Sequence, residues 1–270
     1  MIKFENSGLP LYLDEESNVL AISAQLPFLG YGRKLAGQMK DLWVEYDIVN
    51  ADEPIYDVYR GLAFEKDKVF LDKYNFQYDI TVVLPGTVNG EMKKTSGHYH
   101  GYNPERTYTY AEVYEVLKGT ALYILQRADN FDTDSNDIEI KDVILAKVHA
   151  GETIIVPPNY GHCSVNIGEG PLVFSNLAYK PCPVKYDAVK NYHGMCYYVV
   201  RKNGEILYLK NKSYKNLPEV KHATVRENPS LGIRFGLPVY HSFLKNPDAF
   251  GFLGNPGKDL ETVMNMLIIQ

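Results

Sequence analysis

Short runs of apolar, β-branched and aromatic residues, separated by turns rich in Gly, Pro and Asn, recur along most of the chain. Runs of four to eight such residues are typical of β-strands. The clearest of them predict strands at residues 55–59, 78–84, 111–117, 120–126, 143–149, 153–156, 172–178, 196–201 and 206–209. Many short strands at regular intervals indicate an all-β barrel or sandwich.

The last part of the chain has a different pattern. Leu260, Val263, Met264 and Leu267 fall at i, i+3, i+4 and i+7, after a Pro-Gly turn. This spacing predicts an amphipathic helix that packs on the barrel or on a partner subunit.

Three segments follow from these patterns. We expect an N-terminal segment (1–50) that packs on the barrel, a barrel (51–210), and a C-terminal extension (211–270) that ends in a helix. Within the barrel, the acidic stretch 129–142 is predicted to be a solvated hairpin tip.

The composition is that of a globular protein, with 45% hydrophobic and 23% charged residues and a formal net charge of −5. This charge provides no electrostatic attraction to nucleic acid or to an anionic membrane. The N-terminus has no continuous apolar core, so we expect neither a signal peptide nor a membrane span. Cys163, Cys182 and Cys196 are irregularly spaced, which argues against a disulfide framework. The predicted location is the cytoplasm.

The candidate chemistry centres on His98 and His100. Side chains alternate faces along a strand, so the two imidazoles point the same way, about 7 Å apart. Glu112, at the start of the next predicted strand, and His162, after a Pro-Pro turn, supply two more donors. Three neutral imidazoles and one carboxylate suit a divalent iron, manganese, zinc or nickel ion.

The spacing of these residues resembles the metal signature of the cupin family. In that signature a Gly precedes His-x-His, and a Glu is followed by six residues and a Gly. Glu112 keeps this distance to Gly119, whereas Glu105 and Glu115 do not. A second cupin signature, with its Gly, Pro, His and Asn, is matched by Gly151, Pro157, His162 and Asn166. The resemblance implies a double-stranded β-helix, or jelly-roll, barrel with a few short peripheral helices.

The chain departs from the cupin pattern in two places. Asn159 stands where the second signature has Gly, and a long loop, 101–110, separates His100 from Glu112.

Longer runs resemble the cupin-type glucose-6-phosphate isomerases of archaea and bacteria. The matching runs are IYDVY (55–59), TVVLPG (81–86), TSGHYH (95–100), AEVYEVLKG (111–119), VPPNYGHCSVNIG (156–168) and VVRKNGEI (199–206). The resemblance implies a metal-dependent isomerase that interconverts glucose 6-phosphate and fructose 6-phosphate, as a homodimer.

The resemblance also assigns roles to residues. The metal ligands would be His98, His100, Glu112 and His162, with Glu112 and His162 also catalytic. The residues that match or fall near substrate-contacting positions are Tyr56, Thr81, Thr95, Gly97, Asn159, Lys185 and Tyr186. Hydroxyls and a Gly amide are good donors to a phosphate, and a Lys can serve it as a point charge.

Several alternatives remain open at this point. A carboxylate such as Glu112 would act as the base on an enediol route, whereas a metal-assisted hydride shift needs no base. Because one fold hosts many functions, an oxygenase, an epimerase or a non-catalytic sugar-phosphate sensor would carry the same metal motif.

Overall fold

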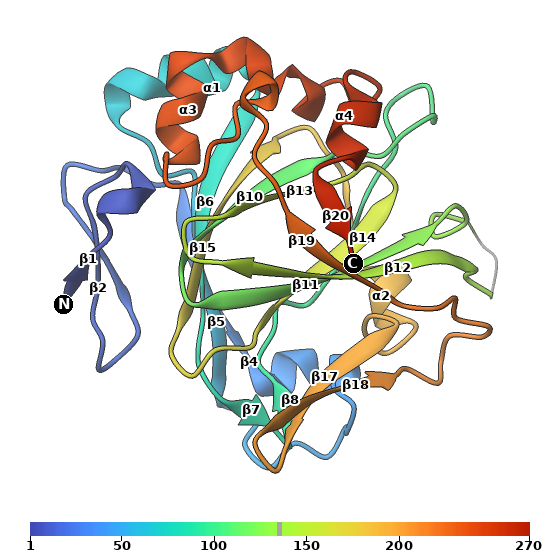
Figure 1. The fold of residues 1–270 in the computed structure, drawn as a ribbon. Coiled ribbons are helices and arrows are strands. Elements are labelled where there is room, and N and C mark those ends of the chain that lie inside the picture. The colour runs from blue at the N-terminus through green and yellow to red at the C-terminus, as the bar shows by residue number, and fades with distance from the viewer. Residues whose placement is uncertain (134–136) are drawn as a thin grey trace.

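The framework of the protein is two facing β-sheets, seen in a computed structural model that describes residues 1–133 and 137–270 (Figure 1). The first sheet contains, in spatial order, β13 (Thr153–Val156), β10 (Glu112–Lys118), β15 (Leu172–Tyr179), β6 (Phe76–Val83), β5 (Pro54–Arg60) and β4 (Gly30–Leu35). The second contains β14 (Tyr160–Asn166), β11 (Thr120–Ala128), β12 (Ile140–His149), β19 (Lys221–Val225) and β20 (Leu267–Ile269). All neighbouring strands in both sheets are antiparallel except β12 and β19. The predicted all-β cupin barrel is confirmed.

Smaller elements surround this framework. The short strands are β1 (Ile2–Lys3), β2 (Leu11–Leu13), β3 (Leu20–Ile22), β7 (Thr87–Val88), β8 (Glu91–Met92), β9 (Tyr99–His100), β16 (Val184–Lys185), β17 (Tyr197–Lys202) and β18 (Glu205–Lys210). The α-helices are α1 (Lys68–Tyr74), α2 (Asp187–Lys190), α3 (Val239–Lys245) and α4 (Leu260–Met264). The 3₁₀ helices are η1 (Glu5–Ser7), η2 (Ala36–Leu42), η3 (Glu65–Asp67), η4 (Pro229–Leu231) and η5 (Pro247–Leu253).

The space between the two sheets is apolar at one end and polar at the other. Val116 and Phe174 belong to a buried apolar cluster that also contains Tyr123 from the opposite sheet. Because side chains alternate along a strand, the same faces of β10 and β15 next present Tyr114 and Asn176, which line a cavity. The apolar end therefore holds the sheets together, and the polar end is available for chemistry.

Helices cover the outer face of the six-stranded sheet (Figure 1). Tyr78 and Ile80 of β6 belong to a second buried cluster together with Leu71 of α1 and Phe243 of α3. The residues on the outer face of the central strands are thus mostly apolar and buried as well.

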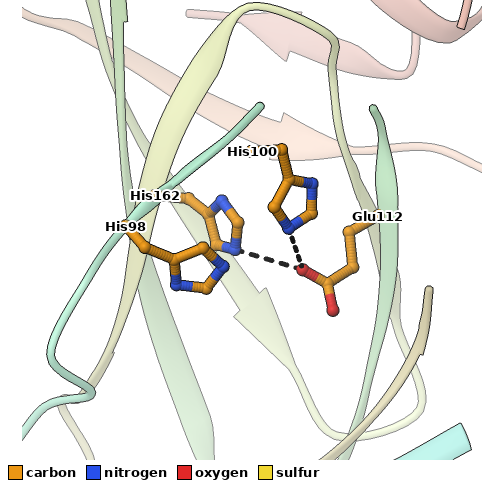
Figure 2. A group of neighbouring side chains, drawn as sticks. All are labelled: His98, His100, Glu112 and His162. Atoms are coloured by element: carbon orange, nitrogen blue, oxygen red, sulfur yellow. Dashed lines mark ion pairs between the residues drawn. The ribbon is translucent and has the colours of Figure 1, made fainter. Parts of the chain in front are cut away.

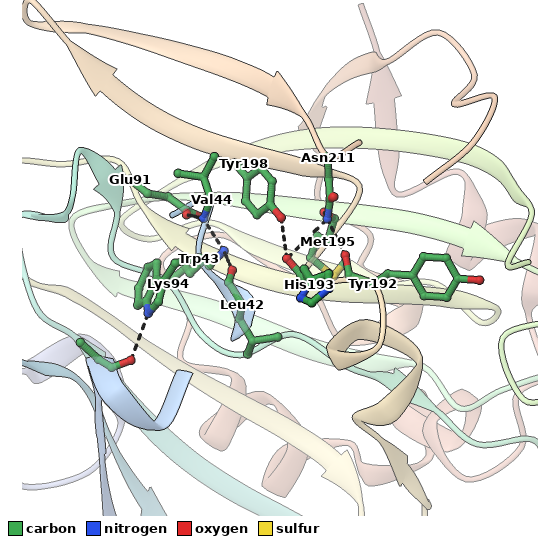
Figure 3. A network of polar contacts seen from close by, with 11 residues as sticks. Leu42, Trp43, Val44, Glu91, Lys94, Tyr192, His193, Met195, Tyr198 and Asn211 are labelled. Atoms are coloured by element: carbon green, nitrogen blue, oxygen red, sulfur yellow. Dashed lines mark hydrogen bonds and ion pairs between the residues drawn. The ribbon is translucent and has the colours of Figure 1, made fainter. Parts of the chain in front are cut away.

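The N-terminal segment is tied to the barrel by a buried polar network (Figure 3). The Glu91 carboxylate accepts hydrogen bonds from the Val44 backbone N–H at 2.7 Å and from the Lys94 ammonium. Lys94 also donates to the Leu42 carbonyl at 2.7 Å, and its ammonium lies over the Trp43 ring. A buried pair with every partner present is costly to break, because removal of one member leaves an uncompensated charge.

The C-terminal prediction is wrong in one respect: the chain ends in a strand. Helix α4 ends at Met264, and Leu267 begins β20, which pairs with β19 at the edge of the five-stranded sheet. The unpaired edge of β19 offers hydrogen-bond partners that the β-branched Ile268 and Ile269 can use in an extended conformation.

Both flanking segments contribute strands to the barrel sheets. Strand β4 lies within the N-terminal 50 residues, and β19 and β20 lie after residue 210. The acidic stretch 129–142 joins β11 to β12, as a hairpin connection should. Residues 134–136, part of that predicted tip, lie outside the described residues. None of the helices in the described part of the chain has the length and apolar character that spanning a membrane requires.

Candidate functional site

Four side chains with metal-ligating atoms meet at one wall of the barrel interior. They are His98, His100, Glu112 and His162, here called the His/Glu cluster (Figure 2). One ligand atom from each residue lies within 4.8 Å of the others. The predicted convergence of these four side chains is therefore confirmed.

Backbone pairing brings the histidines together. The residue pair His98 and His162 forms an antiparallel bridge, with N–H to carbonyl distances of 3.1 and 2.9 Å. The chain enters this bridge through Gly97, which has a φ of +76°. A Cβ atom there would lie 3.1 Å from that of Cys163, so a side chain is excluded both by space and by backbone conformation.

The separations fit a single metal ion. The Nε2 atoms of His100 and His162 lie 3.2 and 3.3 Å from Oε2 of Glu112. Two ligands bound at about 2.1 Å on adjacent coordination positions are themselves separated by about 3 Å. The donor set and its spacing therefore suit a divalent cation without rearrangement of the backbone.

Further hydrogen bonds hold the ligands in place. The Tyr110 carbonyl lies 2.9 Å from Nδ1 of His100, which orients the other ring nitrogen toward the cluster. The Tyr114 hydroxyl donates to Oε2 of Glu112 at 2.8 Å and lies 2.8 Å from Nε2 of His162. The Asn176 amide donates to Oε1 of Glu112, also at 2.8 Å. Such outer contacts set the orientation and basicity of metal ligands.

The electrostatics favour an ionised Glu112. Burial by itself would raise its pKa, but hydrogen bonds to His100 and His162 outweigh burial and hold the pKa well below its usual value. Burial lowers the pKa of His98 and of His162, which keeps both imidazoles neutral, as metal ligation requires. His100 differs: burial lowers its pKa, but hydrogen bonds to Cys182 and Glu112 dominate and raise it.

A cavity of about 280 Å³ opens beside the cluster. Five of the predicted substrate-binding residues line it: Tyr56, Thr81, Thr95, Gly97 and Tyr186. Ser96 adds a hydroxyl, which lies 3.0 Å from the Tyr56 hydroxyl. The cavity thus combines the metal-ligating wall with a set of hydroxyl groups.

Asn159 does not reach this cavity. Its φ of +71° turns the chain between β13 and β14, and its side-chain oxygen accepts the Thr109 backbone N–H at 3.0 Å. Its own backbone N–H donates to the Thr109 hydroxyl at 2.6 Å. The predicted substrate contact is therefore corrected to a turn that braces the loop before β10. Asn suits this position because it tolerates the left-handed conformation better than most residues do.

Lys185 also lies outside the cavity lining. Its ammonium pairs with Asp132 at 2.9 Å, and its neighbour Tyr186 faces the cavity instead, with its ring 5.4 Å from that of His98. Strand alternation explains the correction, because β16 contains Val184 and Lys185, and of these two only Val184 lines the cavity.

Other cavity residues were not predicted: Arg60, Gln77, Asp79, Tyr114 and Asn176. The alternation of side chains along a strand could have identified some of them from the sequence. Tyr114 follows Glu112 by two residues, and Asp79 and Gln77 precede Thr81 by two and four, so each lies on the same strand face as a predicted site residue. Burial raises the pKa of Asp79 to about 6, despite hydrogen bonds from Gly61 and Gln77. Asn176 carries no such signal, since only strand pairing brings β15 beside β10.

Comparisons with known proteins point to one family. A family model described as glucose-6-phosphate isomerase (GPI) matches residues 33–218. The glucose-6-phosphate isomerase of Pyrococcus furiosus is 29% identical over 171 residues, which cover 63% of this chain and 78% of that protein. The enzyme of the same name from Thermococcus onnurineus is 27% identical over 183 residues, covering 67% and 84%. A Bacillus subtilis oxalate decarboxylase structure has a TM-score of 0.29 at 20% identity, covering 46% of this chain and 26% of that one.

Proposed function

The chain belongs to the glucose-6-phosphate isomerase family, and we propose that it interconverts glucose 6-phosphate and fructose 6-phosphate with one divalent metal ion held by the His/Glu cluster. The observation that carries the proposal is the convergence of three imidazoles and one carboxylate on the wall of a hydroxyl-lined cavity. The donor set suits iron, manganese, zinc and nickel. We propose iron, as the family resemblance implies.

The reaction moves one hydrogen between C1 and C2 of the sugar and exchanges the carbonyl and hydroxyl oxygens. A bound cation would supply Lewis acidity toward those oxygens. Glu112 would accept the proton from one carbon and return it to the other, with its Oε1 held by the Asn176 amide and its Oε2 by the Tyr114 hydroxyl. His162 and the Tyr114 hydroxyl would keep that oxygen oriented.

The substrate phosphate would lie at the hydroxyl-lined part of the cavity. Tyr56, Ser96 and Thr81 provide hydroxyl groups there, and Gly97, which also lines the cavity, would provide a backbone N–H. Thr95 contributes mainly by position, because its hydroxyl oxygen accepts the Ser164 backbone N–H at 3.0 Å. The sugar would then extend from this end toward the metal-ligating wall.

We test the function by elemental analysis of the purified protein and by a coupled isomerase assay with fructose 6-phosphate before and after chelation. Turnover is expected to disappear with the metal and to return when a divalent ion is added. Turnover by protein shown to be metal-free would contradict the proposed role of the cluster. A metal-loaded protein that binds the sugar phosphate without converting it would be a sensor, not an enzyme.

The route of the hydrogen is tested in deuterated water. Proton transfer through Glu112 predicts deuterium at C1 or C2 of the product, because a carboxylate exchanges its proton with solvent. A product that contains no solvent deuterium would instead support a hydride shift.

We also propose a cytoplasmic homodimer. Cys163, Cys182 and Cys196 are free thiols, as expected in a reducing compartment. The exposed Leu29 and Tyr31, 72% and 49% exposed, lie at β4, an edge of the six-stranded sheet that a second copy could cover. Light scattering of the purified protein measures the oligomeric state directly.

A further inference from the structure

A second cavity, of about 380 Å³, adjoins the first on the side away from the His/Glu cluster. The two cavities have six lining residues in common: Tyr56, Val58, Arg60, Ser96, Gly97 and Tyr186. Neither Glu112 nor the histidines of the cluster line the second cavity. The shared wall thus contains Tyr56, Ser96 and Gly97, three of the four residues that we assign to the phosphate, so the phosphate would lie where the two cavities meet.

Strand β4 leaves this second space open because it carries glycine where side chains would otherwise fill it. Gly30 lies opposite Arg60 in the strand pairing, and Gly32 lies opposite Val58. A Cβ atom at Gly30 would meet nothing within 4 Å, and one at Gly32 would lie 3.4 Å from Nη1 of Arg60. The Arg60 guanidinium therefore lies over the glycine surface of β4, at the junction of the two cavities.

Arg60 differs from Arg33 and Lys180, two other basic side chains that each line one of the two cavities. Arg33 donates two 2.7 Å hydrogen bonds to the buried Asp57 carboxylate, and Lys180 pairs with Asp72 at 2.8 Å. Within the described residues Arg60 has no such carboxylate partner. Among the described residues that line the first cavity, Arg60 is the one whose permanent positive charge is not already paired with a carboxylate.

The charge of Arg60 reaches the groups of both cavities. Burial raises the pKa of Tyr56, Asp79 and Tyr186, and in all three the charge of Arg60 opposes that rise. In the second cavity Lys34, directly opposite Tyr56 in the strand pairing, and Lys190 add positive charge. Among the described residues that line this cavity, Asp41 is the one carboxylate against them. The junction is therefore cationic, although the protein as a whole is acidic.

We propose that Arg60 is the charged anchor of the substrate phosphate, and that it selects a phosphate monoester dianion over a neutral sugar. This inference rests on the proposed function and adds a residue to its substrate site. The planar guanidinium can donate two parallel hydrogen bonds to a phosphate, whereas the Tyr56, Ser96 and Gly97 donors are neutral. Lys34 and Lys190 lie on the far side of the phosphate and attract the dianion from solvent.

Two variants of Arg60 test the proposal: Arg60→Gln removes the charge, and Arg60→Lys keeps the charge but loses the fork of donors. Lys141→Gln is the matched control, because it removes one positive charge from β12, where Lys141 pairs with Glu139 outside both cavities. For each protein we would measure KM and kcat with fructose 6-phosphate, and the affinity for inorganic phosphate by calorimetry.

Arg60→Gln is expected to raise KM and to weaken phosphate binding about tenfold each, as the loss of one charge-assisted contact predicts. Its kcat should stay within about threefold, because Arg60 does not contact the reacting carbons. Arg60→Lys should recover part of the loss, and Lys141→Gln should match the wild type. The exposed position of Arg60 makes an unchanged thermal midpoint the expected folding control.

Wild-type KM and phosphate affinity in Arg60→Gln would overturn the inference and leave the proposed isomerase function intact. Conversely, if the metal-loaded wild type converts no sugar phosphate but its phosphate affinity still depends on Arg60, the function is wrong and the anion site stands. A loss in kcat alone, with phosphate affinity unchanged, would also count against Arg60 as the anchor.

Discussion

Two glutamates on one strand, Glu112 and Glu115 of β10, face opposite sides of the same sheet. Both are buried, at 4% and 2% exposure. Glu112 points into the cavity between the sheets, among the histidines of the cluster. Glu115, three residues later and therefore on the other face, points outward and accepts the backbone N–H of Val239 at the start of α3, at 2.9 Å.

Their ionisation differs because their partners differ. Glu112 has two imidazoles, the Tyr114 hydroxyl and the Asn176 amide around it, and its pKa lies well below the usual value. Glu115 has only the Val239 N–H and, at 3.4 Å, the Ser175 hydroxyl, and burial raises its pKa to about 8. Equal burial thus yields a permanent anion on one face and a neutral acid on the other. The number of hydrogen-bond donors around each carboxylate, and not its depth of burial, therefore decides which of the two glutamates is ionised.

The strongest test of this comparison is Glu112→Gln against Glu115→Gln. Glu112→Gln removes both a proposed metal ligand and the proposed base, so we expect kcat/KM to fall by about 10³-fold or more, together with loss of bound metal. Glu115→Gln replaces an acid that is largely neutral at pH 7 and should keep turnover within about threefold. Kinetics and elemental analysis of both variants check this, and equal losses would contradict the distinction.

Strand β15, which pairs with β10, shows the same contrast between the residues that contact the two glutamates. Asn176 donates to Glu112, whereas its neighbour Ser175 donates to Glu115. Asn176→Leu should lower metal affinity or kcat/KM by about 10- to 100-fold, because it removes a hydrogen bond that orients a ligand. Ser175→Ala should change neither. Metal titration followed by the coupled assay measures both, and a wild-type metal affinity in Asn176→Leu would show that Glu112 needs no such support.

The dependence of protein stability on pH should reveal the raised pKa of Glu115. Between its usual pKa near 4.5 and its folded value of about 8, the folded carboxyl holds a proton that the unfolded one has lost. The free energy of unfolding therefore falls as pH rises through this window, by at most roughly 1 kcal/mol per pH unit, and levels off above it. Urea denaturation at pH 5, 7 and 9 should show that Glu115→Gln removes this part of the slope. An identical slope in both proteins would contradict the raised pKa.

The smallest expected effect concerns Lys185, which falls near a substrate-contacting position of the family and would serve the phosphate as a point charge. Because its ammonium pairs with Asp132 outside the cavity, Lys185→Gln should change KM by less than about twofold. A tenfold rise in KM would mean that the phosphate lies on the Lys185 side of the barrel and not at Arg60.

The candidate site follows the sequence closely where one strand or one motif decides the outcome. The spacing of Glu112 to Gly119, which Glu115 lacks, selected the glutamate that lies beside the three histidines. The strand predicted at 153–156 has these bounds in the structure, and the Asn203-Gly204 turn joins β17 to β18 with both residues at positive φ. These features depend on neighbours in sequence, whose geometry the backbone constrains directly.

The prediction failed where distant segments compete for the same surface. Leu267 fits a helical stripe, yet it joins β20 because β19 offers an unpaired edge. Asn159 matches a substrate position, yet Thr109, 50 residues away in sequence, uses its side chain. Arg60 has no motif of its own, and only the pairing of its strand with the glycines of β4 makes room for it.

By itself, the sequence determined the barrel, the identity of the His/Glu cluster and the family, because alternation and motif spacing are local properties of the chain. Only the tertiary structure decided which buried carboxylate is charged, which cation lies at the junction of the two cavities, and that residues 267–269 form a strand. Those outcomes depend on which side chains from separate strands lie within hydrogen-bonding distance, and that distance exists only after the sheets have formed.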